Sequence, residues 1–157
     1  MDEMVPTEDQ HFMGLALAEA AAAAEMGEVP VGAVVVHEGK VISSAHNRRE
    51  IDGDPSAHAE FIAMRDAAQV LGDWRLEDCT VYVTLEPCAM CAGLMVNARV
   101  TRCVFAATDP RGGFLGTLGD LSSHPVLNHR FEVTAGVQAG EAADLLRSFF
   151  RRVRAKK

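Results

Sequence analysis

The 157-residue sequence contains no long hydrophobic run, no disulfide framework, and no internal linker, repeat or low-complexity block. Its most apolar stretch, residues 15–24, is interrupted by Glu19 and falls short of the ~20 apolar residues that a membrane-spanning helix needs. The acidic N-terminal residues lack the basic and apolar regions of a signal peptide. We therefore expect a single domain over residues 1–157, located in the cytoplasm and without a membrane partner.

Hydrophobic residues make up 48% and charged residues 24% of the chain, values close to those of an average globular protein. This is enough apolar material for a core, so neither a disulfide nor a metal is needed merely to hold a small fold together. The four cysteines, Cys79, Cys88, Cys91 and Cys103, are unevenly spaced. Such spacing predicts free thiols or metal ligands in a reducing compartment.

The net charge of −7 argues against nucleic acid as a partner, but the charge is unevenly distributed. Residues 147–157 contain six Lys or Arg and no Asp or Glu, which leaves nine basic residues against all 22 acidic ones in the rest of the chain. A basic tail of this kind is typical of a local phosphate-binding patch. The alternative is a solvated helix end, where cations interact favourably with the helix dipole.

Periodicity and turn residues predict an alternation of helices and strands. Thr7 and Gln10 form a capping box and Gly27 is a suitable stop, so the first helix covers residues 8–26. The expected strands are 29–37, 40–46, 79–85, 102–107 and 131–137; the later helices are 57–71, 88–97 and about 141–155; the loops are 47–56 and 109–128. This order predicts a layered α/β fold with helices on both faces of a central sheet.

Three of these segments carry further expectations. The last helix is basic and amphipathic, and its apolar stripe comprises Leu145, Leu146, Phe149, Phe150 and Val153. Of these we expect Phe149 and Phe150 to be core residues. Residues 90–96 are apolar enough to serve either the core or an interface. The loop at 109–128 is rich in Gly, Pro and Asp and is long for a compact domain, which indicates a functional role.

The strongest functional pattern is a His-x-Glu segment, His58 to Glu60, followed after a predicted strand by Pro87, Cys88 and Cys91. The two cysteines are three positions apart, so on a helix they share a face and can bind one ion. Pro87 suits the start of that helix, where the dipole favours the thiolates that a metal needs. His58 also stands at a predicted helix start. Three protein ligands leave one position of a zinc tetrahedron open for water, as in catalytic sites.

Glu60 is the candidate acid–base group of this pattern. It lies among apolar residues at a helix start, where a carboxylate beside a metal-activated water can take a proton and pass it on. The alternative is an ordinary acid at a helix N-terminus, favoured by the dipole. Cys79 and Cys103 lie within apolar strands, and we expect buried thiols there and not a fourth metal ligand.

His-x-Glu followed by Pro-Cys-x-x-Cys is a known signature of zinc-dependent nucleobase deaminases. Together with segments 28–33, 54–60 and 84–93, it makes the chain closely resemble bacterial tRNA-specific adenosine deaminases from about residue 7 to residue 154. The zinc-binding segments are shared by the wider deaminase superfamily. Asn128-His-Arg130 and Phe149-Phe-Arg151 narrow the resemblance to this branch.

The resemblance implies a cytidine-deaminase-like fold, a three-layer α/β/α sandwich around a mixed five-stranded sheet, and a homodimer. It implies one Zn²⁺ per subunit, held by His58, Cys88 and Cys91, with Glu60 as the catalytic group. It also implies conversion of adenosine to inosine at wobble position 34 of a tRNA anticodon, mainly in an arginine tRNA, with the target base flipped out of its stack.

Further residue roles follow from the same resemblance. Asn47 is expected to hydrogen-bond the flipped base and the Ala59 backbone to position it, with a turn role at the strand end as the alternative for Asn47. Asp109 matches an acidic position beside the target nucleotide, where it can accept a hydrogen bond from a ribose 2′-OH. A turn or cap role is equally expected for Asp109. Arg151 and Arg152 are candidates for gripping the phosphate backbone.

The chain departs from some relatives at Arg49, where they have proline, and at Thr108, where they have arginine; both positions flank the expected pocket. Three other functions share part of the pattern. A free nucleobase or nucleotide deaminase of guanine or cytosine type needs the zinc site but no basic tail. A nucleic-acid-binding module with structural zinc needs no proton transfer by Glu60, and a thiol-redox Cys-x-x-Cys protein needs no zinc.

Overall fold

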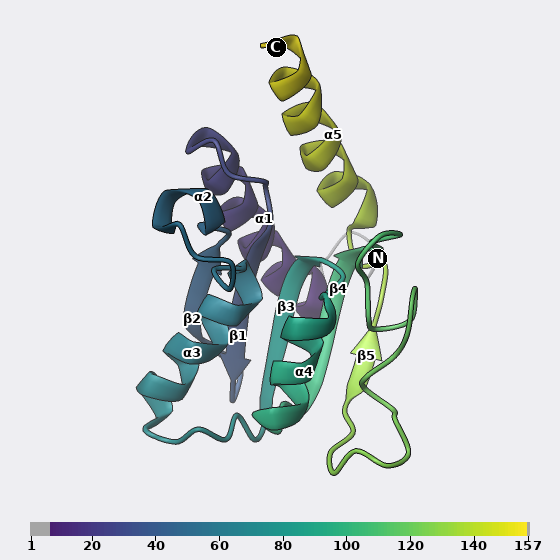
Figure 1. The fold of residues 1–157 in the computed structure, drawn as a ribbon. Coiled ribbons are helices and arrows are strands. Elements are labelled where there is room, and N and C mark those ends of the chain that lie inside the picture. Colours follow the sequence, from purple (N-terminus) through teal and green to yellow (C-terminus); the bar gives the residue numbers. More distant parts are fainter. Residues whose placement is uncertain (1–6, 157) are drawn as a thin grey trace, which may run out of the picture.

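The computed structural model describes residues 7–156 and places a five-stranded sheet at the centre of the chain (Figure 1). The strands are β1 (Gly32–His37), β2 (Lys40–His46), β3 (Cys79–Leu85), β4 (Arg102–Ala107) and β5 (Glu132–Thr134). Their order in the sheet is β2-β1-β3-β4-β5. β1 pairs antiparallel with β2 and β3, whereas β3, β4 and β5 are parallel, so the sheet is mixed as expected. Residues 1–6 and Lys157 of the basic tail lie outside the described residues.

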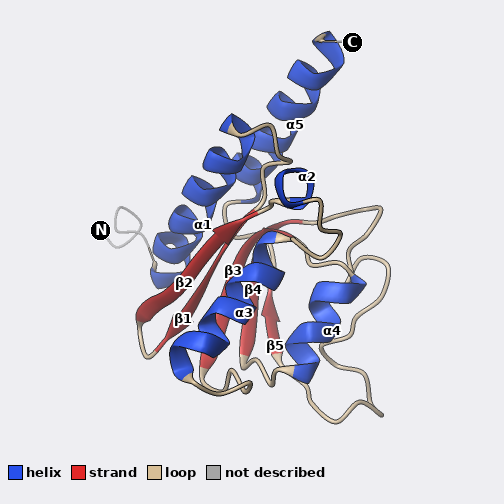
Figure 2. Ribbon diagram, turned by 60° about the vertical axis from the view of Figure 1, so that its left-hand side comes forward, coloured by secondary structure: helices blue, strands red, loops and turns tan. Residues whose placement is uncertain are grey.

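Helices cover both faces of this sheet (Figure 2). They are α1 (Glu8–Glu25), α2 (Arg49–Asp52), α3 (Ala59–Leu71), α4 (Ala89–Asn97) and α5 (Ala139–Ala155). α1 and α5 pack on the face that carries Val34, Tyr82 and Val104. α3 and α4 pack on the other face, which carries Val35 and Phe105. The three-layer α/β/α arrangement expected from the sequence is confirmed.

The first helix begins as its sequence predicts. Thr7 accepts a hydrogen bond from the Gln10 N–H, and the Gln10 side chain accepts one from the Thr7 N–H, which completes the capping box. The small residues of α1 allow close contact with the sheet. A Cβ on Gly32 would lie only 2.1 Å from the carbonyl oxygen of Ala16, so only glycine fits at this point of β1.

The first strand begins later than expected. β1 starts at Gly32 and not at residue 29, because Pro30 has no N–H for a strand partner and the Val31 N–H bonds back to the Val29 carbonyl oxygen at 2.9 Å. The last strand is shorter than the expected 131–137. β5 ends at Thr134, shortly before a turn with Gly136 at a φ of +85°.

Segment 47–56, expected to be a loop, contains the one-turn helix α2. An ion pair between Arg48 and Asp52, 3.0 Å apart and four residues apart in the chain, closes this turn. Gly53, in the left-handed conformation, ends it. The turn is too short to produce a periodic pattern, so hydrophobic spacing gives no signal of it.

The last helix extends beyond the sheet. α5 begins at Ala139, two residues earlier than expected, and its C-terminal part projects from the rest of the fold (Figure 1). Phe149 is buried, but Phe150 and Val153 are 42% and 36% exposed. The expectation of a core residue is therefore confirmed for Phe149 and wrong for Phe150, because the apolar stripe continues past the surface that it covers. Among residues 7–156, no helix is long and apolar enough to cross a bilayer.

Candidate active site

Two helix starts meet at one edge of the sheet. β3 ends at Leu85 and leads into α4, while the chain after β2 leads through α2 into α3. His58 is the N-cap of α3 and Cys88 is the N-cap of α4, both with an extended backbone. These cap positions are the reason why both helices begin slightly later than expected. Cys91 lies in the first turn of α4, on the same side as Cys88.

The structure brings the three expected metal ligands together. The Nδ1 atom of His58 lies 3.7 Å from the Sγ atom of Cys88 and 3.7 Å from that of Cys91. The ligand atoms of this His-Cys-Cys trio lie within 4.8 Å of one another, close enough to bind one ion. No further His, Cys, Asp or Glu within residues 7–156 joins the group. Cys79 and Cys103 are buried in β3 and β4.

Contacts inside the trio favour a charged Cys88. Hydrogen bonding from Cys91 lowers the pKa of Cys88 most, and contact with the His58 ring adds to this, so that the pKa falls to about 3 although burial acts in the opposite direction. The hydrogen bond to Cys88 and burial both raise the pKa of Cys91. The thiolate is the form of cysteine that binds a metal, so Cys88 is prepared as a ligand.

Glu60 lines the same site from the first turn of α3. It is 3% exposed, and this burial raises its pKa to about 7, although a backbone hydrogen bond and the charge of His58 act in the opposite direction. A carboxyl group with a pKa near 7 can both accept and release a proton at neutral pH. Glu60 therefore has the property of a general acid–base group.

A pocket opens over His58, Cys88 and Glu60. Its lining residues are Val29, Val31, Asn47, Arg49, His58, Ala59, Glu60, Leu85, Glu86, Cys88 and Asp109. Apolar side chains with a few convergent polar groups are typical of a small-molecule site. The expected substrate contacts Asn47, Ala59 and Asp109 thus line one pocket with Glu60. Arg49 lines it as well.

Asn47 shapes the turn after β2 and also lines the pocket. Its Nδ2 donates to the Val29 carbonyl oxygen at 3.3 Å, and its Oδ1 accepts from the Arg49 N–H at 3.1 Å. It is only 8% exposed. The turn role considered as an alternative is therefore present, and it fixes the side chain beside the pocket.

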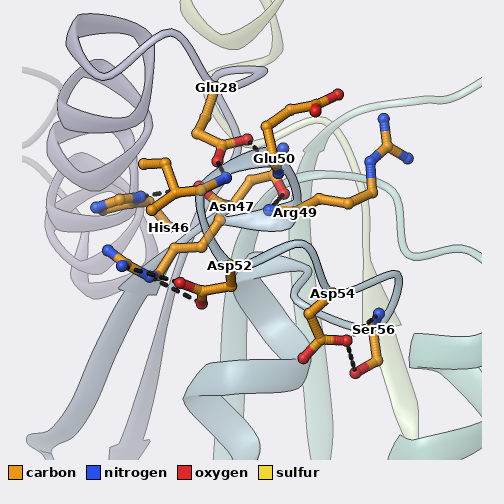
Figure 3. A network of polar contacts seen from close by, with 10 residues as sticks. Glu28, His46, Asn47, Arg49, Glu50, Asp52, Asp54 and Ser56 are labelled. Carbon is orange, nitrogen blue, oxygen red and sulfur yellow. Dashed lines mark hydrogen bonds and ion pairs between the residues drawn. The ribbon is translucent and has the colours of Figure 1, made fainter.

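A buried carboxylate holds the segment that follows Asn47 (Figure 3). Glu28, 1% exposed, accepts hydrogen bonds from the N–H groups of Glu50 and Ile51 at 3.2 and 2.7 Å. These groups belong to the first turn of α2, so Glu28 satisfies donors that a helix start leaves unpaired. The sequence assigns no role to Glu28, because its partners are backbone groups about 20 residues away; the only signal is an acid directly before a buried apolar run.

The long loop after β4 is tied to the pocket by another buried acid. Glu86 accepts a hydrogen bond from the Asp109 N–H at 3.0 Å. Asp109 accepts one from the Arg111 N–H at 3.0 Å, which is the turn role considered for it. The chain then runs irregularly to residue 131, with a bridge between Leu115 and Asp120. The sequence assigns no role to Glu86 either.

Arg151 and Arg152 are not among the pocket residues. Both are exposed on α5. Arg151 lines a separate surface groove with Leu146, Arg147, Phe150 and Arg154. The structure thus places these two arginines on the projecting helix and does not join them to the pocket.

The chain is similar to known proteins in sequence and in fold. A family model described as MafB19-like deaminase matches residues 7–154. The chain is similar to the tRNA-specific adenosine deaminase of Bacillus subtilis (strain 168), with 49% identity over 151 residues that cover 96% of this chain and 94% of that protein. A structure from a study of A-to-I editing by tRNA:A34 deaminases is similar at 43% identity and a TM-score of 0.84, covering 87% of this chain and 99% of the other. The guanine deaminase of Nitrosomonas europaea is similar at 26% identity and a TM-score of 0.77, covering 89% of this chain and 83% of the other.

Proposed function

The chain belongs to the tRNA-specific adenosine deaminase family, and from this premise we propose that it converts adenosine to inosine at wobble position 34 of a tRNA anticodon. Water adds at C6 of the adenine and ammonia leaves. One observation carries the proposal: Glu60, a buried carboxyl group with a pKa of about 7, lines one pocket beside the His-Cys-Cys trio.

We assign Zn²⁺ to the trio, one ion per chain. One imidazole nitrogen and two thiolates are a known donor set of catalytic zinc, which leaves a fourth position open. The 3.7 Å between the His58 nitrogen and each sulfur suits ligands that lie about 2.0–2.3 Å from a shared tetrahedral ion. Bound there, zinc would lower the pKa of water to about 7 and so would supply a nucleophile at neutral pH.

The protons of the reaction move through Glu60. Its carboxylate takes a proton from the attacking water and gives it to ring N1; it then takes the proton of the hydroxyl added at C6 and delivers it to the departing amine as the C6–N bond breaks. Asn47, held by its two turn contacts, hydrogen-bonds the flipped base, and the Ala59 backbone positions it. Val31 and Leu85 line the pocket as apolar walls for the ring.

Two regions are proposed to contact RNA. Asp109, in the pocket wall, accepts a hydrogen bond from a ribose 2′-OH beside the target, which favours RNA over DNA. Arg151 and Arg152 bind phosphates of the anticodon arm. Their exposure on a projecting helix supports this assignment, because phosphate contacts dominate the affinity of proteins for nucleic acids. We also propose a cytoplasmic location, which a tRNA substrate supports.

The direct test is incubation of the purified enzyme with an unmodified tRNA transcript that carries adenosine at position 34. We expect position 34 to be sequenced as guanosine, the base that inosine resembles, with no change at other adenosines. Free adenosine, guanine and cytidine are run in parallel. Deamination of free guanine or cytidine with none of the transcript would contradict the proposal and favour the free-base or nucleotide deaminase alternative.

We further propose that an arginine tRNA is the main substrate and that the enzyme is a homodimer. Met90, 36% exposed, and the half-buried Leu94 lie on the outer side of α4, whereas Met95 on its inner side is fully buried. An apolar outer face of this kind suits an interface. Light scattering should give twice the 16.9 kDa of one chain, and a monomer mass would contradict the dimer. Parallel assays of transcripts for different tRNAs test the choice of substrate.

A further inference from the structure

Glu86 is a buried acid that the proposed reaction does not use. It lies between the end of β3 and Pro87, two residues before the metal ligand Cys88, and is 2% exposed. Its N–H donates to the carbonyl oxygen of Ala107 at the end of β4, at 2.8 Å, so the sheet fixes its backbone. A buried carboxylate is costly unless it is hydrogen-bonded, so the partners of Glu86 indicate its role.

Its carboxylate bonds to one stretch of the long loop, residues 109–117. Oε1 accepts hydrogen bonds from the Asp109 N–H at 3.0 Å and from the Thr117 hydroxyl. Oε2 accepts them from the N–H groups of Leu115 and Thr117, both at 3.1 Å. The carboxylate thus supplies the acceptors that a sheet or helix would otherwise give to these loop donors.

Gly113 shows how closely the loop surrounds this carboxylate. A Cβ on Gly113 would lie 2.2 Å from the Glu86 carboxyl carbon and 2.3 and 2.5 Å from its oxygens. The next residue, Phe114, donates its N–H to the Pro87 carbonyl oxygen at 2.9 Å. Loop 109–117 and the start of α4 therefore form one unit around Glu86.

We propose that Glu86 is a positioning residue that holds loop 109–117 in place and so sets its first residue, Asp109, in the pocket wall against the substrate. The identity of that substrate rests on the proposed function, whereas the loop contacts do not. Glu60 and Glu86 thus have separate roles: Glu60 moves protons, and both oxygens of Glu86 are committed to the loop. Without this anchor the loop must be ordered when a nucleotide binds, at an entropic cost that weakens binding.

Glu86→Gln tests the anchor at almost constant volume. The substitution replaces one acceptor oxygen by an NH₂ donor. Whichever way the amide turns, its NH₂ group faces at least one backbone N–H, either that of Asp109 or those of Leu115 and Thr117. Part of the anchor is therefore removed, while the three metal ligands stay unchanged.

Gly113→Ala perturbs the same contact from the loop side and leaves the charge of Glu86 intact, so the test stays decisive if the first variant folds poorly. Gly140→Ala is the matched control, because no heavy atom lies within 4 Å of a Cβ added at this helical glycine. Arg111, exposed within the loop, reports loop order, since trypsin cleaves after it more readily when the loop is loose.

The variants are compared as full-length, zinc-loaded proteins on an RNA hairpin with adenosine at the wobble position. We expect Glu86→Gln and Gly113→Ala to retain zinc, to be cleaved at Arg111 at least about fivefold faster, and to raise KM about tenfold with kcat within about twofold. Gly140→Ala should match the wild type in all four measurements.

Unchanged cleavage and KM in both variants overturns the proposal, and so does loss of zinc from Glu86→Gln, which would assign the acid to the metal site. The cleavage assay does not depend on RNA. If the wild type is inactive on the hairpin but both variants are still cleaved faster at Arg111, the proposed function fails and the anchoring of the loop stands.

Discussion

Glu60 and Cys88 lie side by side in the pocket, yet their substitution should have different consequences. Glu60→Gln keeps the size of the side chain but removes its ability to carry protons. We expect the zinc content to stay at one ion per chain, while inosine formation on an A34 transcript falls at least about 10²-fold. Metal analysis and single-turnover kinetics measure the two effects separately. Turnover within threefold of the wild type would contradict a role in proton transfer and would leave Glu60 only the role of an acid that stabilises the helix start.

Cys88→Ala removes the ligand whose pKa lies farthest below the usual value of a thiol. We expect loss of the metal and of activity together, because two remaining ligands hold zinc weakly. Cys103→Ala is the control: Cys103 is a buried cysteine that lies in β4 and not in the trio, so this variant should keep its zinc. Retention of zinc by Cys88→Ala would contradict the assigned metal centre.

Single residues were predictable where chemistry depends on spacing. His58, Cys88 and Cys91 follow a pattern of residue types at fixed separations, and the structure brings the three together. Glu28 and Glu86 were not predictable, because each bonds to backbone N–H groups of a distant segment. Backbone groups have no sequence identity, so no pattern in the chain indicates such a contact before the fold is known.

At the scale of elements, an ion pair ties α1 to the sheet. The two Asp9 oxygens accept from the Arg102 guanidinium of β4 at 2.9 and 2.7 Å, and Asp9 also accepts from the Tyr82 hydroxyl of β3 at 2.7 Å. Hydrogen bonding to Arg102 is the main cause that holds the pKa of Asp9 below its usual value of 3.8. The pair therefore contributes its full stabilisation above pH 3.8, the usual pKa of an aspartate. This contribution is lost as the pH falls through the lower pKa that Asp9 has in the folded protein.

Asp9→Asn should lower the free energy of unfolding by about 1 kcal/mol at pH 7, because it removes one partner of this partly buried pair. The difference from the wild type should shrink as the pH falls below about 4, where the wild-type carboxyl becomes protonated as well. Urea titrations between pH 3 and pH 7 measure both effects. Asp144→Asn, in an exposed pair with Arg147, is the control and should change little. A difference that stays constant with pH would show that the charge of Asp9 does not matter.

Elements with long regular patterns were predicted well. β3 and β4 have the expected bounds, 79–85 and 102–107, because both are mostly buried runs with turn residues on either side. α2 and the short β5 were predicted poorly. α2 depends on Glu28, and β5 has only three residues paired with β4, so contacts between distant segments and not local preference determine both.

At the scale of the whole molecule, the basic residues at the C-terminal end of α5 lie apart from the pocket. Deletion of residues 151–157 should raise KM for an A34 hairpin at least about tenfold in 0.15 M salt, with little change in kcat. In a plot of log KM against the logarithm of the salt concentration, the slope should also fall by about 0.7–0.9 for each phosphate that the shortened chain no longer binds. Arg75→Ala, an exposed arginine beside Trp74, is the control and should leave both values unchanged. Unchanged KM and salt dependence after the deletion would favour a solvated helix end over an RNA contact.

The overall architecture was predictable because the order of elements limits the ways in which a sheet can be covered. Hydrophobic strands that alternate with helices require both faces of the sheet to be buried, and the structure has this arrangement. The course of α5 was not predictable in the same way. Its stripe is apolar throughout, and only the extent of the surface beneath it determines that Phe149 is buried and Phe150 is not.

The contact between α1 and β1 at Gly32 also limits how this protein can vary. Every amino acid other than glycine has a Cβ, which at position 32 would lie 2.1 Å from the Ala16 carbonyl oxygen. The helix layer would therefore have to move away from the sheet. Such overpacking typically costs about 1–3 kcal/mol, and at a backbone contact there is no flexible side chain to move aside. In a saturation library screened for folded protein, position 32 should return glycine alone, whereas Gly14, in the middle of the same helix layer with nothing near a Cβ, should accept alanine and serine. Recovery of a Gly32→Ala variant with the melting temperature of the parent would show that the helix and the sheet can move apart at no cost in stability.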